Sequence, residues 1–164
     1  MGGKLYDLTN PQKSIWLTEQ FYKGKNINNI CATLMIKEKV NISKLCDSIN
    51  FFIKSNKSFG IKLKIVDGQP KQFFSDPQDT SFKVLELNDY KDVKRLAQET
   101  TNEIFNIETD NLFKFKVFHL KNNYGGFVVM LHHLIGDAAT MSLVAKQIVD
   151  IYSHLVKRTR TYSQ

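Results

Sequence analysis

The sequence predicts one α/β domain, an α+β two-layer sandwich in which a mixed, largely antiparallel sheet is covered by helices. Segments of helical periodicity are interspersed along the chain with segments of β character, and the Asp67-Gly68 pair favours a hairpin between two of the latter. With 164 residues, 42% of them hydrophobic, the chain matches a single globular domain over residues 1–164.

The first predicted helix lies within residues 8–24. Asn10 is a candidate N-cap, Pro11 suits the first helical position, and Gly24 is a typical stop signal. The residues between these signals recur at helical spacing, so a short opening helix is expected.

Three more helices are predicted from apolar residues that repeat with a period near 3.6. They cover residues 41–56, 90–106 and 139–158. Asn41 stands at the start of the first of these segments, and Thr140 is a candidate cap for the last.

Strands are predicted in runs of β character bounded by turn residues. The runs are 29–38, two within 59–75, then 81–88, 112–120 and 125–133. In the last run the stretch GFVVML has no polar alternation, which is typical of a central strand buried on both faces.

The formal net charge of +7 comes almost entirely from lysine, since arginine occurs only as Arg95, Arg158 and Arg160. Lysines alternate with apolar residues in 59–66 and 112–120, as on the solvated face of an amphipathic strand. Nucleic-acid interfaces instead favour clustered charge and arginine forks. We therefore expect no nucleic-acid partner, while an acidic protein partner is compatible with the charge.

Cysteine content and hydropathy indicate the compartment. Cys31 and Cys46 are too far apart for a CxxC element and too few for a disulfide framework, so reduced thiols are expected. No run of about 18 apolar residues is present, and the polar N-terminal stretch lacks an apolar signal core. The sequence therefore predicts a soluble, cytoplasmic protein with no membrane partner.

The candidate site is VVMLHHLIGDAATMSL, residues 128–143, where a buried strand is expected to end and a helix to begin. His132 and His133 lie at this junction, and Asp137 follows them. Adjacent strand residues point to opposite faces, so one histidine is expected to be structural and the other active. A metal site is disfavoured, because zinc histidines on a helix are spaced i, i+4, and neither a nearby cysteine nor a second acidic ligand completes a site. Two hydrogen-bonded histidines without any chemistry remain an alternative.

The stretch HHLIGDA, residues 132–138, resembles the HHxxxDG signature of the condensation domains of non-ribosomal peptide synthetases, which share an acyltransferase superfamily with chloramphenicol acetyltransferase. Four other stretches resemble motifs of that family in order and spacing. They are LTNPQKSIWLTEQF (8–21), DGQPKQ (67–72), IFNIETDNLFKFKVFHL (104–120) and IYSHL (151–155). The resemblance spans nearly the whole chain and implies a chloramphenicol acetyltransferase-like half-domain.

The resemblance implies that His133 is the catalytic residue facing a channel, that His132 supports it, and that Asp137 holds the loop. Amide formation from a thioester requires the ammonium nucleophile to lose a proton, and an imidazole can assist near neutral pH. Whether His133 acts as a base, or positions the amine and stabilises the oxyanion, is open at this point. The resemblance also implies that substrates arrive on the 4'-phosphopantetheine arms of carrier proteins, and that the domain itself binds no cofactor or metal.

Two residues depart from the family pattern. Ala138 replaces the glycine after the aspartate, a mild change unless the position needs a positive φ or the space. Gly60 stands where an arginine would ordinarily pair with Asp137, so the aspartate must find another partner or stay wetter. Lys62, two residues along the same strand face, is a candidate substitute for that arginine.

Length is a third departure, because condensation domains resemble two such halves with the reaction channel between them and are roughly two or three times as long as this chain. The resemblance therefore implies an N-terminal subdomain whose partner is the missing C-terminal half. Such a half is expected to be inactive alone, because positioning and water exclusion are lost. Two alternatives are an O-acyltransferase of the same superfamily and a non-catalytic scaffold that binds carrier proteins.

Overall fold

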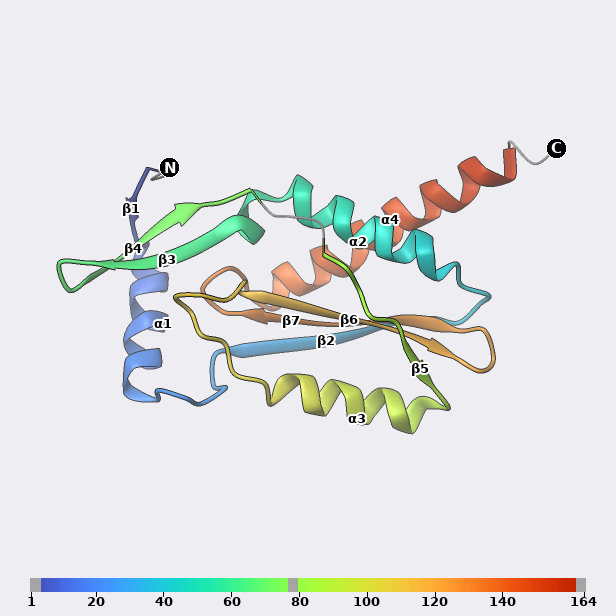
Figure 1. The fold of residues 1–164 in the computed structure, drawn as a ribbon, viewed down its shortest axis with the longest axis horizontal. Coiled ribbons are helices and arrows are strands. Elements are labelled where there is room, and N and C mark those ends of the chain that lie inside the picture. Colours follow the sequence, from blue (N-terminus) through green and yellow to red (C-terminus); the bar gives the residue numbers. More distant parts are fainter. Residues whose placement is uncertain (1–3, 77–79, 162–164) are drawn as a thin grey trace.

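The computed structural model describes residues 4–76 and 80–161, and its centre is a four-stranded sheet (Figure 1). The strands are β2 (Asn29–Ile36), β5 (Leu85–Leu87), β6 (Phe113–Leu120) and β7 (Gly125–His132), in the order β2-β7-β6-β5. β7 runs antiparallel to both of its neighbours, whereas β5 is parallel to β6. The sheet is mixed, largely antiparallel and covered by helices, as the sequence predicted.

Helices lie on both faces of this sheet. The α-helices in the described part of the chain are α1 (Asn10–Phe21), α2 (Ile42–Ser55), α3 (Tyr90–Thr101) and α4 (Ala138–Thr161), and a short 3-10 helix, Lys57–Gly60, follows α2. α2 and α4 cover one face and α3 covers the other (Figure 1). The arrangement therefore has one helical layer more than a two-layer sandwich. None of the described helices is both long and apolar enough to cross a membrane.

Two helices begin at other caps than the sequence suggested. Thr9, and not Asn10, caps α1: the Gln12 N–H donates to the Thr9 hydroxyl, and the Thr9 N–H donates to the Gln12 side chain. Asp137, and not Thr140, caps α4, because its carboxylate accepts a hydrogen bond from the Thr140 N–H. In both cases the helix uses the residue whose side-chain oxygen reaches the N–H three positions onward.

Two predicted segments are shorter in the structure. α3 ends at Thr101, well before residue 106. At this end Thr100, Thr101 and Asn102 follow one another. Threonine and asparagine are weak helix formers, because their side chains lose rotamer freedom or compete for backbone hydrogen bonds. In the predicted strand 81–88, only Leu85–Leu87 pairs with β6.

The Asp67-Gly68 hairpin lies in a second sheet, which the sequence did not separate from the first. Its strands are β1 (Tyr6–Asp7), β3 (Ile61–Val66) and β4 (Gln69–Phe74), in the order β1-β4-β3. Asp67 and Gly68 have φ of 50° and 75°. Positive φ at both positions is what a tight two-residue hairpin turn requires, so the predicted hairpin is confirmed.

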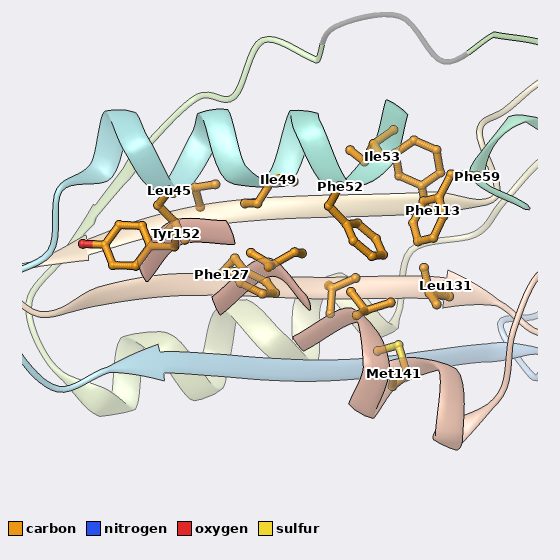
Figure 2. Close-up of a cluster of buried hydrophobic side chains, with 14 of the residues drawn as sticks. Leu45, Ile49, Phe52, Ile53, Phe59, Phe113, Phe127, Leu131, Met141 and Tyr152 are labelled. Carbon is orange, nitrogen blue, oxygen red and sulfur yellow. The ribbon is translucent and has the colours of Figure 1, made fainter. Parts of the chain in front are cut away.

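The main core lies between the central sheet and the layer of α2 and α4 (Figure 2). α2 contributes Leu45, Ile49, Phe52 and Ile53, whose spacing places them on one face of the helix. The other strands and helices of this cluster contribute Val117, Phe127, Val129, Leu131, Val144 and Ile148, among others. Full burial of such a side chain stabilises the fold by roughly 1.5–3 kcal/mol, so this cluster is the main anchor of β7.

β7 is buried on both faces, as its uninterrupted apolar run predicted. All eight of its residues are buried. Phe127, Val129 and Leu131 belong to the core under α2 and α4, while Val128 packs with Val93 of α3. The strand that carries the candidate site is therefore held from both sides.

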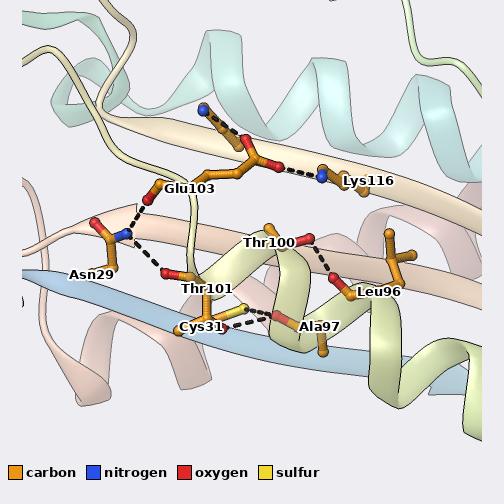
Figure 3. A network of polar contacts seen from close by, with 9 residues as sticks. Asn29, Cys31, Leu96, Ala97, Thr100, Thr101, Glu103 and Lys116 are labelled. Atoms are coloured by element: carbon orange, nitrogen blue, oxygen red, sulfur yellow. Dashed lines mark hydrogen bonds and ion pairs between the residues drawn. The ribbon is translucent and has the colours of Figure 1, made fainter. Parts of the chain in front are cut away.

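Lys114 and Lys116 of β6 are ion-paired with Glu103 and do not stand free on a solvated face. Figure 3 shows the pair of Lys116 and Glu103. The Lys114 ammonium donates to one carboxylate oxygen of Glu103 at 2.7 Å, and the Lys116 ammonium donates to the other. Glu103 lies just beyond the end of α3, and its backbone carbonyl accepts a hydrogen bond from Asn29 of β2. This cluster ties α3 to the middle and the edge of the central sheet.

Candidate active site

β7 carries the two histidines to the point where the chain leaves the central sheet. His132 is the last residue of β7 and pairs with Asn29 of β2. The His132 N–H donates to the carbonyl of Leu112, and the His133 N–H donates to the carbonyl of Asn28, both at 2.9 Å. The backbone of both histidines is therefore fixed before α4 begins.

The ring of His132 is enclosed, with only 1% of the residue exposed. Its Nδ1 accepts a hydrogen bond from the Leu134 N–H at 3.2 Å, and its Nε2 lies 3.4 Å from the Glu19 carboxylate. Because Nδ1 is an acceptor, the proton of the neutral ring sits on Nε2 and points at Glu19. Burial lowers the pKa of His132 below its ordinary value, although the Glu19 carboxylate acts in the opposite direction.

The ring of Phe105 packs edge-on against His132, with centroids 5.9 Å apart. Phe105 is itself buried and lies in one of the stretches that resemble the family. His132 is therefore surrounded by a carboxylate, a backbone amide and an aromatic ring, an environment that suits a supporting residue.

His133 has a different environment, because it is partly exposed while its neighbour is buried. The two adjacent histidines thus have different environments, as expected for neighbouring residues at the end of a strand. The catalytic role of His133 stays a prediction.

Asp137 is exposed and caps α4. Its carboxylate accepts hydrogen bonds from the N–H and the hydroxyl of Thr140, both at 2.8 Å, while its own N–H donates to that hydroxyl at 3.2 Å. These hydrogen bonds hold the pKa of Asp137 below its ordinary value. Asp137 therefore caps the helix that follows, and its role in the site stays a prediction.

Lys62 is not the partner of Asp137, contrary to the substitution that the sequence suggested. The Lys62 ammonium donates to the carbonyl of Thr109 at 3.4 Å and lies near Asp110. Burial lowers the pKa of Lys62, with Asp110 acting against that shift. Gly60 is buried, and its carbonyl accepts a hydrogen bond from the Ser75 N–H. The Asp137 carboxylate thus remains solvated, so it does not need a buried cation as a partner.

Ala138 is the first residue of α4 and is exposed. Among the described residues, only Asp67 and Asn123 have a positive φ without being glycine. Ala138 thus occupies an ordinary helical conformation, and the change from glycine carries no backbone strain here.

Two glutamines connect the loop after β7 to the rest of the fold. The Gln12 amide donates to the carbonyl of Leu134 at 3.1 Å and to the side-chain oxygen of Gln72 at 3.1 Å. The Gln72 amide donates back to the side-chain oxygen of Gln12 at 3.0 Å. Both glutamines lie in stretches that resemble family motifs, and that resemblance is the signal that could have pointed to them.

Glu19 and Asn28 also belong to the site and were missed by the sequence reasoning. Glu19 is 7% exposed and Asn28 is 8% exposed, and the Asn28 amide donates to the Glu19 carboxylate at 2.5 Å. Glu19 lies on α1, whose polar residues are otherwise not buried. No local pattern separates such a residue from a solvent-facing glutamate, because its burial depends on β2 and β7.

A metal centre has no support in the described residues. No group of three or more histidine, cysteine or acidic side chains in residues 4–76 and 80–161 is arranged to hold an ion. The polar groups described at the site are the imidazoles of His132 and His133, the buried carboxylate of Glu19 and backbone groups.

Comparison with known proteins identifies a family and relatives. The condensation-domain family matches residues 3–164. The chain is 27% identical over 163 residues to surfactin synthase subunit 1 of Bacillus subtilis, and the match covers 95% of this chain and 4% of that protein. It is 22% identical over 147 residues to bacitracin synthase 3 of Bacillus licheniformis, where the match covers 90% of this chain and 2% of the relative. The chain thus spans a small part of each synthetase.

Solved structures show the same fold. The first condensation domain of the CDA synthetase superposes with a TM-score of 0.85 at 14% identity, covering 95% of this chain and 42% of that one. The starter condensation domain of rhizomide synthetase gives a TM-score of 0.83 at 21% identity, with 94% and 40% covered. The match to the family model runs through all the motif stretches and the site just described. This chain belongs to the condensation-domain family.

Proposed function

We propose that this chain supplies the histidine half of a condensation active site, which joins a peptidyl or aminoacyl thioester to the amine of an aminoacyl thioester. The observation that carries the proposal is the division between the two histidines. His132 is locked in the fold, whereas His133 is partly exposed at the end of a strand that is buried on both faces. A rigid strand end followed by one partly exposed histidine is a suitable place for acyl transfer.

The chemistry needs one proton acceptor at the amine. The amine nitrogen attacks the thioester carbon, the new C–N bond forms, and the ammonium proton passes to the His133 imidazole. The tetrahedral intermediate then collapses, the C–S bond breaks, and the leaving thiolate takes the proton back. The same imidazole can stabilise the oxyanion once it is protonated, so base and electrostatic roles are compatible in one cycle.

Partners follow from this reaction. Both thioesters are expected on 4'-phosphopantetheine arms of carrier proteins in the cytoplasm, and a second lobe is expected to close the channel over His133. The chain covers 40–42% of the solved condensation-domain chains described above, which leaves room for that lobe in a complete domain. Closure would exclude water from the thioester and align the two substrates. No metal or cofactor is assigned to the domain itself.

The test is single-turnover amide formation between two loaded carrier proteins, measured with the native protein that contains this chain. His133→Ala is expected to lower the rate by about 100-fold or more, as loss of a general base and of positioning together would. His154→Ala is the matched control, because His154 is exposed on α4 and its Nδ1 contacts a backbone carbonyl of its own helix.

Three outcomes separate the alternatives. Undiminished product with His133→Ala would overturn the catalytic role and favour a scaffold that binds carrier proteins. An ester formed with a hydroxyl acceptor, and no amide with an amine, would indicate an O-acyltransferase. Amide formation by residues 1–164 alone would contradict the need for a second lobe.

A further inference from the structure

Glu19 is a buried carboxylate that the proposed reaction does not use directly. It is the buried residue of α1, with 7% of its surface exposed. Burial of a carboxylate is unfavourable unless hydrogen-bond donors replace the lost water. The structure supplies two such donors: one is the side chain of Asn28, and the other is the ring of His132.

The first donor is the side-chain amide of Asn28, 2.5 Å from the Oε2 atom of Glu19. The second is the His132 ring, whose Nε2 lies 3.4 Å from the same oxygen. The hydrogen bond from the Leu134 N–H to Nδ1 leaves the ring proton on Nε2, so the ring donates toward the carboxylate. Glu19 thus selects the orientation of His132 together with Leu134.

Asn28 extends the connection to His133. Its side chain is used by Glu19, and its backbone carbonyl accepts the hydrogen bond of the His133 N–H at 2.9 Å. Asn28 immediately precedes β2, whose first residue pairs with His132. The Glu19 side chain therefore contacts two residues that hold the backbone of His133. One is His132, which precedes it in the chain, and the other is Asn28, whose carbonyl accepts the His133 N–H.

We propose that Glu19 is a positioning residue for His133, acting through Asn28 and the ring of His132. This inference rests on the function proposed for His133 above. Glu19 does not touch substrate in this account. It fixes the backbone from which the His133 imidazole extends, in the way that outer groups orient the reacting groups of other sites.

A plain structural role is the competing explanation, in which Glu19 only attaches α1 to the sheet. The two accounts differ in what they change. A structural role predicts that Glu19 variants lose stability, with any activity loss following the unfolded fraction. A positioning role predicts a fall in kcat in protein that is fully folded, with KM for the carrier substrates preserved.

The kinetic experiment uses the native protein that contains this chain and the two-carrier assay. Glu19→Ala is expected to lower kcat by about 10- to 100-fold with KM changed less than about twofold, and Asn28→Ala is expected to do the same. Glu19→Gln is expected to retain most activity, since its amide oxygen can accept both hydrogen bonds. Glu99→Ala is the matched control, because Glu99 is an exposed helical glutamate with one distant ion pair to Arg95.

Coupling between the residues gives a second kinetic criterion. If Glu19 acts through Asn28, the kcat of the double variant Glu19→Ala/Asn28→Ala should be only slightly lower than the kcat of the more damaging single variant. Effects that multiply fully would instead show that the two residues act independently, and would overturn the proposed connection.

The ring of His132 provides a readout that does not depend on activity. In ¹⁵N-edited NMR spectra of the folded protein, the Nε2–H signal of His132 should be protected from exchange in wild type and in Glu19→Gln. The same signal should exchange rapidly in Glu19→Ala. Equal protection in Glu19→Ala and wild type would contradict the hydrogen bond on which the inference depends.

The outcomes also separate this inference from the proposed function. If His133→Ala retains full activity, the proposed function fails, whatever the Glu19 variants do. If His133→Ala is inactive while folded Glu19→Ala and Asn28→Ala keep wild-type kcat, only the positioning role fails. If Glu19→Ala does not fold, Asn28→Ala decides, because wild-type kcat in that variant overturns the inference and a reduced kcat supports it.

Discussion

The side-chain amides of Gln12 and Gln72 face each other and exchange two hydrogen bonds, with N···O distances of 3.1 and 3.0 Å. The same Gln12 amide reaches the carbonyl of Leu134, directly after the histidine pair. Gln12 lies on α1 and Gln72 on β4, so three segments far apart in the sequence meet at this point. The small sheet and the opening helix are thereby attached to the loop that carries His133.

Gln12→Leu is predicted to destabilise the fold by about 1–3 kcal/mol, because it leaves the side-chain oxygen of the buried Gln72 and the Leu134 carbonyl without the donor that Gln12 supplies. Urea unfolding followed by circular dichroism measures the change. The double variant Gln12→Leu/Gln72→Leu should cost less than the sum of the two single variants, since it removes both polar partners together. Additive losses would contradict the reciprocal pair.

Gly126→Ala is predicted to prevent folding or to cost more than about 4 kcal/mol. A Cβ atom at this position would overlap the backbone carbonyl of Leu34 on the adjacent strand β2, and a backbone group in a paired strand cannot move aside cheaply. Expression yield and urea unfolding are the measurements. Gly24→Ala is the comparison, because Gly24 has a φ of 77° but open space around the position of the added Cβ. This substitution should lower the free energy of unfolding by only about 1–2 kcal/mol.

The local elements were predictable where a pattern of neighbouring residues decides them. The apolar spacing of Leu45, Ile49, Phe52 and Ile53 identified α2, and the run that ends at Leu131 identified a strand buried on both faces. The alternation of side chains along a strand also predicted that the two histidines have different environments. These features depend on the spacing of apolar and polar residues along the chain, which can be read directly from the sequence.

Features that depend on distant partners were not predictable in the same way. The two-residue strand β1 is defined only by pairing of Tyr6 with Gln72 and of Asp7 with Lys71. Glu19 is polar and helical, and nothing near it in the sequence indicates that β2 and β7 will enclose it. The cap of α1 is a different case, since Thr9 and Gln12 have the spacing of a capping box, and that local signal outweighs the one at Asn10.

Asp137→Asn is predicted to fold like wild type, whereas Asp137→Ala is predicted to loosen the first turn of α4. Asparagine caps helices about as well as aspartate, while alanine offers no acceptor to the Thr140 N–H. Hydrogen exchange at the Thr140 amide should be faster in Asp137→Ala and unchanged in Asp137→Asn. Equal exchange in all three proteins would show that the cap does not hold this turn.

Lys62→Met is predicted to leave the titration of Asp137 unchanged. The low pKa of Asp137 comes from its hydrogen bonds to Thr140, and the Lys62 ammonium contacts the Thr109 carbonyl instead. NMR titration of the Asp137 carboxyl group measures the midpoint in wild type, Lys62→Met and Thr140→Ala. The midpoint should rise only in Thr140→Ala, and a rise in Lys62→Met would restore Lys62 as the substitute for the family's arginine.

The Glu103 cluster is predicted to make stability depend on pH in the acid range. Burial alone would raise the pKa of Glu103, but the hydrogen bonds and charges of Lys114 and Lys116 together hold it below its ordinary value. A carboxyl group whose pKa is lower in the folded than in the unfolded chain stabilises the fold above its unfolded pKa. That stabilisation is lost as the pH falls through the folded pKa.

Glu103→Gln should therefore be less stable than wild type at pH 7, by no more than about 1 kcal/mol, since the cluster is partly exposed and solvent screens the charges. The difference should shrink as the pH falls below about 4, where wild type loses the same charge. Urea midpoints of the two proteins between about pH 3 and pH 7, a range that spans ordinary carboxyl pKa values, measure it. A difference that stays constant over this range would contradict a contribution from the charge, because wild type and variant carry the same charge at this position once the carboxyl group is protonated.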